Sequence, residues 1–282
     1  MKKPVIFWIL FFVIGQCPDV ISEIQPAKKP ETKGTLFIIG GGKISEALTK
    51  QMVDLMPRGR GGYALVFTQT SSEPDTSFYY LKKRFRLFSE NPILMWGDSV
   101  FDESMRDSIR NASLIYITGG DQGRFLSAVD SLTQQAIRDA YHNGAMVAGT
   151  SAGAALMSSL MITGDQRMVE EYESTYSSLI YNNGIYAKGL GLLDSVIVDQ
   201  HFVTRSRYNR IISAMADTNL PYGIGIEEST ALIVAPDYMK VAGENQVILF
   251  RRPGSYFRHN DRIGLRNLRI NIYLPGDTFH LK

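Results

Sequence analysis

Short apolar runs alternate with segments of helical spacing along the first half of the chain. Four runs have the length of buried strands, and two segments between them repeat apolar residues at the period of an amphipathic helix. The runs are residues 35–39, 63–68, 114–118 and 145–149, and the helical segments are residues 44–56 and 122–143. Strands that are apolar on both faces and alternate with helices are typical of a covered parallel sheet. The pattern therefore predicts an α/β fold of three layers, with a mostly parallel sheet between two layers of helices.

The second half of the chain changes character. Residues 195–199 predict a further strand and residues 204–217 predict a helix, after which short strands follow one another through turns. These strands are residues 224–226, 230–234, 239–242, 247–250 and 268–274. We expect a single α/β domain over residues 34–282, with an antiparallel extension at its C-terminal edge.

The first 33 residues differ from the rest. Residues 1–17 contain lysines at positions 2 and 3, no acid, and an uninterrupted apolar run of ten residues from Val5 to Ile14. Such a run is too short to span a bilayer comfortably and is typical of a signal peptide. Residues 18–33 are mostly polar and contain three prolines, as in a flexible tether. We therefore expect an exported protein, periplasmic or secreted; the alternative is that the run is a buried helix or strand.

Cys17 is the only cysteine, so the chain has no intrachain disulfide and no cysteine-ligated metal cluster. Its position after the apolar run is also typical of a lipoprotein site, where lipid on the thiol would be the only membrane contact. Gln16 stands where such signals usually have a small residue. The net charge of +2 comes from Lys2 and Lys3, so the remaining chain is balanced and gives no reason to expect a nucleic-acid partner.

A nucleophile motif follows the run at 145–149. Residues 149–153 read Gly-Thr-Ser-Ala-Gly, a G-x-S-x-G elbow between a predicted strand and a predicted helix, with Ser151 as the nucleophile. The helix that begins here directs its free N–H groups at the site, and the N–H of Ala152 would stabilise an oxyanion. The alternative is a small-residue helix start that is capped by Ser151 or Thr150.

A serine nucleophile needs a base and an acid that orients the base. The histidines are His142, His201, His259 and His280. His201 follows the strand at 195–199, which would place it at the same sheet edge as the elbow, whereas the other three lie in polar segments. The candidate acids are residues 227 and 228, two glutamates between apolar runs, with an exposed turn as the alternative.

Four segments in consistent order resemble the cyanophycinase family, serine peptidases that share a fold with class I glutamine amidotransferases. The segments are ITGGDQGRF (117–125), GTSAGAALM (149–157), DQHFVTRSRYNRI (199–211) and GIGIEESTALIV (223–234), with a weaker echo in FIIGGGK (37–43). The resemblance implies the amidotransferase-like three-layer fold and no metal or cofactor. It implies that Ser151 is the nucleophile, His201 the base and Glu228 the orienting acid. Gly120 would be the second oxyanion contact beside Ala152.

The resemblance also implies a substrate pocket. The residues that match it are Asp121, Gln122, Asp199, Gln200, Arg205, Arg207 and Arg210. Cyanophycin is a poly-aspartate chain that carries arginine on its β-carboxyl groups, and guanidinium groups bind carboxylates through paired hydrogen bonds. The three arginines cannot share one helix face, so one or two would reach a peptide or cyanophycin-like substrate. The others would pair with acids.

Several alternatives stay open. The substrate could instead be an aspartyl or isoaspartyl dipeptide, and dimers are a common state of such enzymes. In an α/β-hydrolase esterase the acid precedes the histidine, so His259 or His280 would replace His201. A binding module without activity is a third alternative. Residues 227–228 are Glu-Glu where the family usually has Asp-Glu. The segment between residues 162 and 189 is rich in tyrosine and acid. It would be either a contact for a substrate arginine or a solvated loop.

Overall fold

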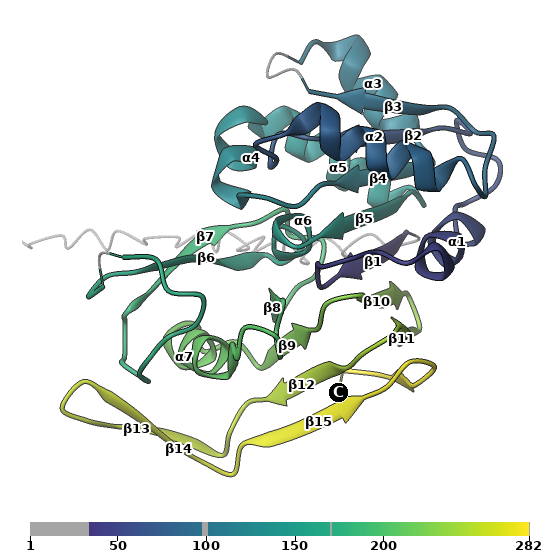
Figure 1. The fold of residues 1–282 in the computed structure, drawn as a ribbon. Coiled ribbons are helices and arrows are strands. Elements are labelled where there is room, and N and C mark those ends of the chain that lie inside the picture. Colours follow the sequence, from purple (N-terminus) through teal and green to yellow (C-terminus); the bar gives the residue numbers. More distant parts are fainter. Residues whose placement is uncertain (1–33, 98–100, 170, 282) are drawn as a thin grey trace, which may run out of the picture. The chain divides into compact units, whose positions relative to one another are not determined.

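An eight-stranded sheet is the largest sheet of the fold (Figure 1). The computed structural model describes residues 34–97, 101–169 and 171–281. In order of neighbours, the strands are β16 (Thr278–Phe279), β11 (Tyr238–Gly243), β10 (Thr230–Ala235), β1 (Thr35–Ile39), β5 (Met146–Thr150), β4 (Leu114–Ile117), β2 (Ala64–Phe67) and β3 (Ile93–Trp96). The pairs from β1 to β3 are parallel, and the pairs from β1 to β16 are antiparallel.

Helices cover both faces of this sheet. They are α1 (Glu46–Asp54) and α2 (Pro74–Phe85) on one face, and α3 (Glu103–Asn111), α4 (Gln122–Ala128), α5 (Ser131–His142) and the short α6 (Ala152–Ala155) on the other. Successive residues of β1 show the two faces. Leu36 and Ile38 belong to the core that contains α3 and α5, whereas Phe37 and Ile39 belong to the core that contains α1 and α2. The predicted three-layer α/β fold is confirmed.

A second sheet takes up part of the predicted antiparallel extension. Its order is β15 (Arg269–Tyr273), β12 (Val247–Arg251), β9 (Tyr222–Ile226) and β8 (Val196–Gln200), and only β8 and β9 pair in parallel. Helix α7 (Tyr208–Thr218) packs on it through Ile211 and Met215, which contact Phe202 and Phe250 in one apolar cluster. Two hairpins complete the described fold, β6 (Leu160–Gln166) with β7 (Gly184–Lys188) and β13 (Ser255–His259) with β14 (Arg262–Arg266).

Some predicted boundaries were wrong. The single helix expected over residues 122–143 is two helices, because the Asp130 side chain caps α5 by accepting from the Thr133 N–H at 2.9 Å. The helix expected from residue 204 begins at Tyr208. Residues 74–111 also contain α2, β3 and α3, which were not predicted, although β3 is an apolar run of four residues.

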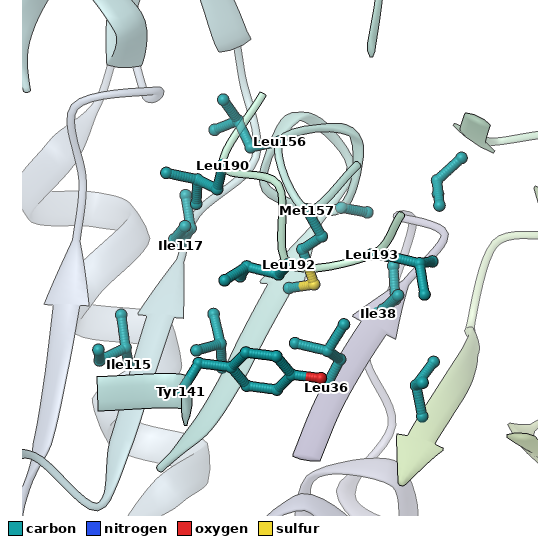
Figure 2. Packing of buried hydrophobic residues seen from close by; sticks show 14 of the residues in the cluster. Leu36, Ile38, Ile115, Ile117, Tyr141, Leu156, Met157, Leu190, Leu192 and Leu193 are labelled. Carbon is teal, nitrogen blue, oxygen red and sulfur yellow. The ribbon is translucent and has the colours of Figure 1, made fainter. Parts of the chain in front are cut away.

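The turn into α6 lies on tightly packed supports. A Cβ at Gly153 would lie 2.3 Å from the Ile117 carbonyl oxygen, and a Cβ at Gly149 would lie 2.5 Å from the Gly153 carbonyl oxygen. Figure 2 shows Leu156 and Met157 after α6 among the buried side chains of the core, near Leu190 and Leu192. Both glycines are needed because α6 approaches β4 and β5 too closely for a side chain. The packing therefore positions residue 151.

The predicted signal peptide, the tether and Cys17 lie outside the described residues. Within the described ranges, no helix is long and apolar enough to cross a membrane.

Candidate active site

Ser151 occupies the sharp turn between β5 and α6. Its φ of 53° and ψ of −111° lie in a region that non-glycine residues rarely adopt. The Ser151 N–H donates to the Ile39 carbonyl at 3.0 Å, and the Ser151 carbonyl accepts from Ala154 and Ala155. The side chain makes no capping hydrogen bond to the helix. The alternative in which Ser151 serves as a helix cap through its hydroxyl is therefore not observed.

The imidazole of His201 lies between the serine and a glutamate. Ser151 Oγ is 2.8 Å from His201 Nε2, and His201 Nδ1 is 2.5 Å from Glu228 Oε1. An ionised carboxylate only accepts hydrogen bonds, so Nδ1 carries the hydrogen and Nε2 presents its lone pair to the serine hydroxyl. The three side chains come from the ends of β5, β8 and β9. Their geometry is that of a Ser-His-Glu triad.

Three consecutive backbone carbonyls at the end of β1 bind the loops that carry Ser151, His201 and Glu228. Ile39 O accepts from the N–H of the serine at 3.0 Å, and Gly40 O accepts from the N–H of His201 at 2.7 Å. Gly41 O accepts from the N–H of Ser229, the residue after the acid, at 3.0 Å. One short stretch of backbone therefore sets the spacing of nucleophile, base and acid.

The glycines of this stretch also give the triad room. A Cβ at Gly41 would lie 2.3 Å from His201 Cε1, and a Cβ at Gly42 would lie 2.7 Å from Glu228 Oε2. Both glycines have positive φ, 103° and 68°. These glycines belong to the segment FIIGGGK (37–43), for which no role was predicted. Three successive glycines at the end of a predicted strand are the signal that could have indicated a close backbone approach.

Gly120 and Ala152, the predicted oxyanion donors, both lie beside Ser151. Gly120 lines the same cavity as the serine, and a Cβ at the preceding Gly119 would lie 3.3 Å from Ser151 Cβ. Ala152 is the first residue of α6. Neither N–H donates to another group in the part of the chain that the structure describes. Both N–H groups can therefore donate to an oxygen that develops negative charge.

The surroundings of His201 favour its neutral form. Burial lowers the pKa of this imidazole; the hydrogen bond to Glu228 acts in the opposite direction, and the charges of Arg205 and Arg207 lower the pKa further. The net effect is a pKa below its ordinary value. A general base must be unprotonated, so this shift suits the imidazole for proton removal at neutral pH.

Glu227 holds the turn that follows His201. Its carboxylate is 5% exposed and accepts from the N–H of Val203, from the N–H of Thr204 at 3.1 Å and from the Thr204 hydroxyl. Burial alone would raise the pKa of Glu227, but these hydrogen bonds outweigh it and the pKa is lowered. This capture of residues 203 and 204 explains why α7 begins later than predicted. Sequence reasoning named the pair 227–228 but did not separate the two roles.

A cavity of about 440 Å³ opens beside the nucleophile. Every residue predicted to bind substrate lines it, except Asp199, which is fully buried. The lining residues from that prediction are Asp121, Gln122, Gln200, Arg205, Arg207 and Arg210.

Asp199 pairs with two of the three arginines. Arg210 binds it through two hydrogen bonds, one of them from Nε to Oδ2 at 2.9 Å, and Arg207 Nη1 is 3.3 Å from Oδ1. Arg205 is half-buried and forms no salt bridge with any described residue. The expected pairing of some arginines with an acid is observed for Arg207 and Arg210, and contact of Arg205 with the substrate stays a prediction.

The tyrosine-rich segment after β6 packs against the start of α7. The Tyr172 hydroxyl accepts from Arg207 Nη2 at 3.2 Å and lines the cavity, while Arg207 Nε donates to the Ser174 carbonyl at 3.0 Å. Tyr176 is 1% exposed. Tyr172 itself is exposed, so a contact between this segment and a substrate arginine stays a prediction.

The other histidines lie away from Ser151. His142 ends α5, His259 ends β13 and His280 follows β16, and none of them lines the cavity. The order of residues expected for an α/β-hydrolase esterase is therefore not observed. Among the described residues, no group of three or more His, Cys, Asp or Glu is placed to hold a metal ion.

Comparison with known families identifies the family of the chain. A model of peptidase family S51 matches residues 36–242, a range that contains Ser151, His201 and Glu228. The chain belongs to family S51. The resemblance to cyanophycinases inferred from four segments is thereby confirmed.

Two curated relatives of this S51 chain are named cyanophycinase. The protein of Trichormus variabilis is 37% identical over 186 residues, which are 63% of this chain and 60% of that protein. The protein of Synechococcus elongatus is 31% identical over 266 residues, 89% of this chain and 80% of that protein. The alignment with the first thus spans about three fifths of the relative's length.

Solved structures support the fold. A peptidase from an acI-B1 Actinobacterium superposes with a TM-score of 0.63 at 19% identity and covers 90% of this chain and 99% of its own. A putative peptidase E protein from Listeria monocytogenes gives a TM-score of 0.50 at 14% identity, covering 74% and 98%. At these identities the likeness concerns the fold alone.

Replacing Glu228 by Gln should slow the reaction of Ser151 by roughly 10³- to 10⁴-fold, because the imidazole loses its orienting charge. The rate needs neutral His201, so it should fall as the pH drops through the pKa of that imidazole, with a midpoint below about 6.5 in the unaltered protein. Removing the carboxylate removes an interaction that raises this pKa, so the midpoint should move lower still. Labelling of Ser151 by a fluorophosphonate across pH measures both effects.

The control for this change is Glu244→Gln, which removes one charge from an exposed residue. We expect its pH profile to match that of the unaltered protein. A Glu228→Gln variant with an unchanged rate and midpoint would contradict the triad.

Replacing Gly41 by Ala should lower the labelling rate about 100-fold, because the new Cβ displaces the His201 ring and a shift near 1 Å has this order of effect. Gly59→Ala is the matched control: its φ of 87° imposes similar backbone strain, but no atom lies within 4 Å of the new Cβ. Equal losses in the two variants would mean that strain, and not contact with the imidazole, is responsible.

Replacing Asp199 by Asn should lower the free energy of unfolding by about 3–5 kcal/mol, because two buried guanidinium groups lose their counter-charge. Urea denaturation followed by circular dichroism measures the change. Asp237→Asn, at an exposed turn, should change the same quantity by less than about 0.5 kcal/mol. Similar values for both variants would show that Asp199 is not the counter-ion of the cluster.

Proposed function

We propose that this S51 protein is a serine peptidase that hydrolyses peptide or isopeptide bonds at aspartyl residues of β-aspartyl-arginine substrates. The observation that supports this proposal is the hydrogen-bonded chain from Ser151 through His201 to Glu228, at the wall of a cavity that arginines line. The geometry supplies a nucleophile, a base of lowered pKa and two unused backbone donors. These are the parts that acyl transfer needs.

The reaction begins with proton transfer from the Ser151 hydroxyl to Nε2 of His201 as the oxygen attacks the substrate carbonyl. The imidazolium that forms is stabilised by Glu228, and the oxyanion accepts from the N–H groups of Gly120 and Ala152. His201 then donates the proton to the leaving amine, which completes the acyl-enzyme. A water molecule, deprotonated by the same imidazole, attacks the ester and releases the acid product.

The substrate class rests on charge and on the relatives. Arg205 lines the cavity without a salt-bridge partner among the described residues, so its guanidinium is available for an aspartyl carboxylate. The curated relatives are named cyanophycinase. Export is a second part of the proposal, and it rests on the composition of residues 1–17 alone.

Incubation of the full-length protein with cyanophycin, β-aspartyl-arginine and ordinary peptides tests the function. We expect release of β-aspartyl-arginine units from the polymer, measured by mass spectrometry, and no cleavage of ordinary peptides. Ser151→Ala should lower the rate by roughly a thousandfold or more.

The product masses separate the alternatives. Hydrolysis of the β-aspartyl-arginine dipeptide in preference to the polymer would instead assign the alternative, a dipeptidase of the aspartyl or isoaspartyl type. An active Ser151→Ala variant would refute the mechanism, whatever the substrate.

A further inference from the structure

Strand β6 is irregular where it passes the cavity. Between Ile162 and Gln166, β6 advances four residues while its partner β7 advances two. The extra residues form a bulge around Gly164, whose φ is 105°. Bulges re-aim side chains and are common beside active sites. Here the residue after the glycine, Asp165, lines the cavity that contains the nucleophile.

Side-chain hydrogen bonds fix the bulge. Gln122 Nε2 donates to the carbonyls of Ile162 at 3.0 Å and Thr163 at 2.8 Å. The Thr163 hydroxyl donates to the Ile185 carbonyl at 3.0 Å and accepts from the Asp165 N–H at 3.2 Å. Both donors of the Gln122 amide are thus used within the protein, although sequence reasoning expected this residue to bind substrate. These hydrogen bonds fix the backbone that leads to Asp165 and carries it. A residue that recognises substrate needs such a fixed position.

The carboxylate of Asp165 has no hydrogen-bond or salt-bridge partner among the described residues. Two carboxylates belong to the described lining of the cavity, those of Asp121 and Asp165. That of Asp121 accepts from the N–H groups of Gly123 at 2.6 Å and Arg124 at 3.3 Å, and so caps α4. The Asp165 side chain is exposed and forms no hydrogen bond or salt bridge with any residue that the structure describes.

Among the described lining residues, Asp165 and Arg205 are the charged side chains that form no hydrogen bond or salt bridge. Asp199 occupies the guanidinium groups of Arg207 and Arg210, which leaves Arg205 as the cation without a salt bridge in the described lining. No salt bridge joins Arg205 to Asp165. A cavity with separated, unpaired charges of opposite sign complements a zwitterionic ligand.

We propose that Asp165 is a specificity-determining residue that binds a cationic group of the substrate, with a guanidinium as the best match. This inference rests on the proposed function and names the part of the substrate that the bulge recognises. A carboxylate accepts two parallel N–H groups from a guanidinium, and the pair is stronger than a neutral hydrogen bond. Asp165 does not touch the reacting atoms and acts only through binding.

Two synthetic oligomers test the proposal. One contains three β-aspartyl-arginine units, and the other contains citrulline in place of each arginine, which keeps the shape and removes the positive charge. We expect the full-length protein to cleave the arginine oligomer with a kcat/KM about 10- to 100-fold higher. Asp165→Asn should remove most of this preference by raising KM for the arginine oligomer, with the citrulline oligomer changed less than about twofold.

Two further variants separate recognition from general effects. Glu171→Gln removes one negative charge from the same segment at a position outside the cavity lining, and it should keep the preference. Asp165→Glu should retain part of it. Equal loss for both oligomers in Asp165→Asn, or a preference that survives this change, would overturn the proposal.

A binding measurement distinguishes this proposal from the proposed hydrolysis. In Ser151→Ala, calorimetry should show tighter binding of the arginine oligomer than of the citrulline oligomer, and Asp165→Asn in that background should abolish the difference. Absence of turnover by the unaltered protein together with this binding difference would refute the function and keep the recognition role. Equal affinities would refute the recognition role.

Discussion

The carbonyl groups of residues 39–41 accept hydrogen bonds from the loops that carry the nucleophile, the base and the acid. These carbonyls project from the end of a central strand that is buried on both faces, so they have little freedom to move. The three catalytic side chains are 50 and 27 residues apart in the chain. In addition to the direct contacts between their loops, a common set of acceptors relates all three to one rigid element.

The same hydrogen bonds hold strained backbone. The carbonyls accept from the N–H groups of three residues with positive φ. These are Ser151 at 53°, His201 at 49° and Ser229 at 57°. Such conformations cost on the order of 1–3 kcal/mol each and persist only where the surroundings determine them. Gly41 and Gly42 add the space that the imidazole and the carboxylate need. The end of β1 therefore lies against the strained backbone of the three loops, binds it through hydrogen bonds and leaves space for the side chains of His201 and Glu228.

Some charged side chains at the cavity stabilise its wall, and others can contact a substrate. Asp199 is fully buried with two arginines, and one of these arginines also binds the Tyr172 hydroxyl and the Ser174 carbonyl of the segment after β6. That guanidinium joins the wall of the cavity to the segment that covers part of it. The charges that remain without such partners among the described residues, at positions 165 and 205, are those that can discriminate between substrates.

The alternation of apolar runs and helical segments determined the three-layer α/β fold, because a strand buried on both faces must be apolar throughout. The G-x-S-x-G turn and four local segments likewise indicated the triad residues and the family. Local patterns could not separate the two sheets, divide the helix at Asp130 or distinguish the roles of Glu227 and Glu228. Each of these depends on contacts between residues distant in sequence. The pairing of the arginines with Asp199, the carbonyl contacts of Gly40 and the bulge that presents Asp165 were decided by tertiary structure alone, since hydrogen bonds and close approaches across strands leave no periodic signal in the chain.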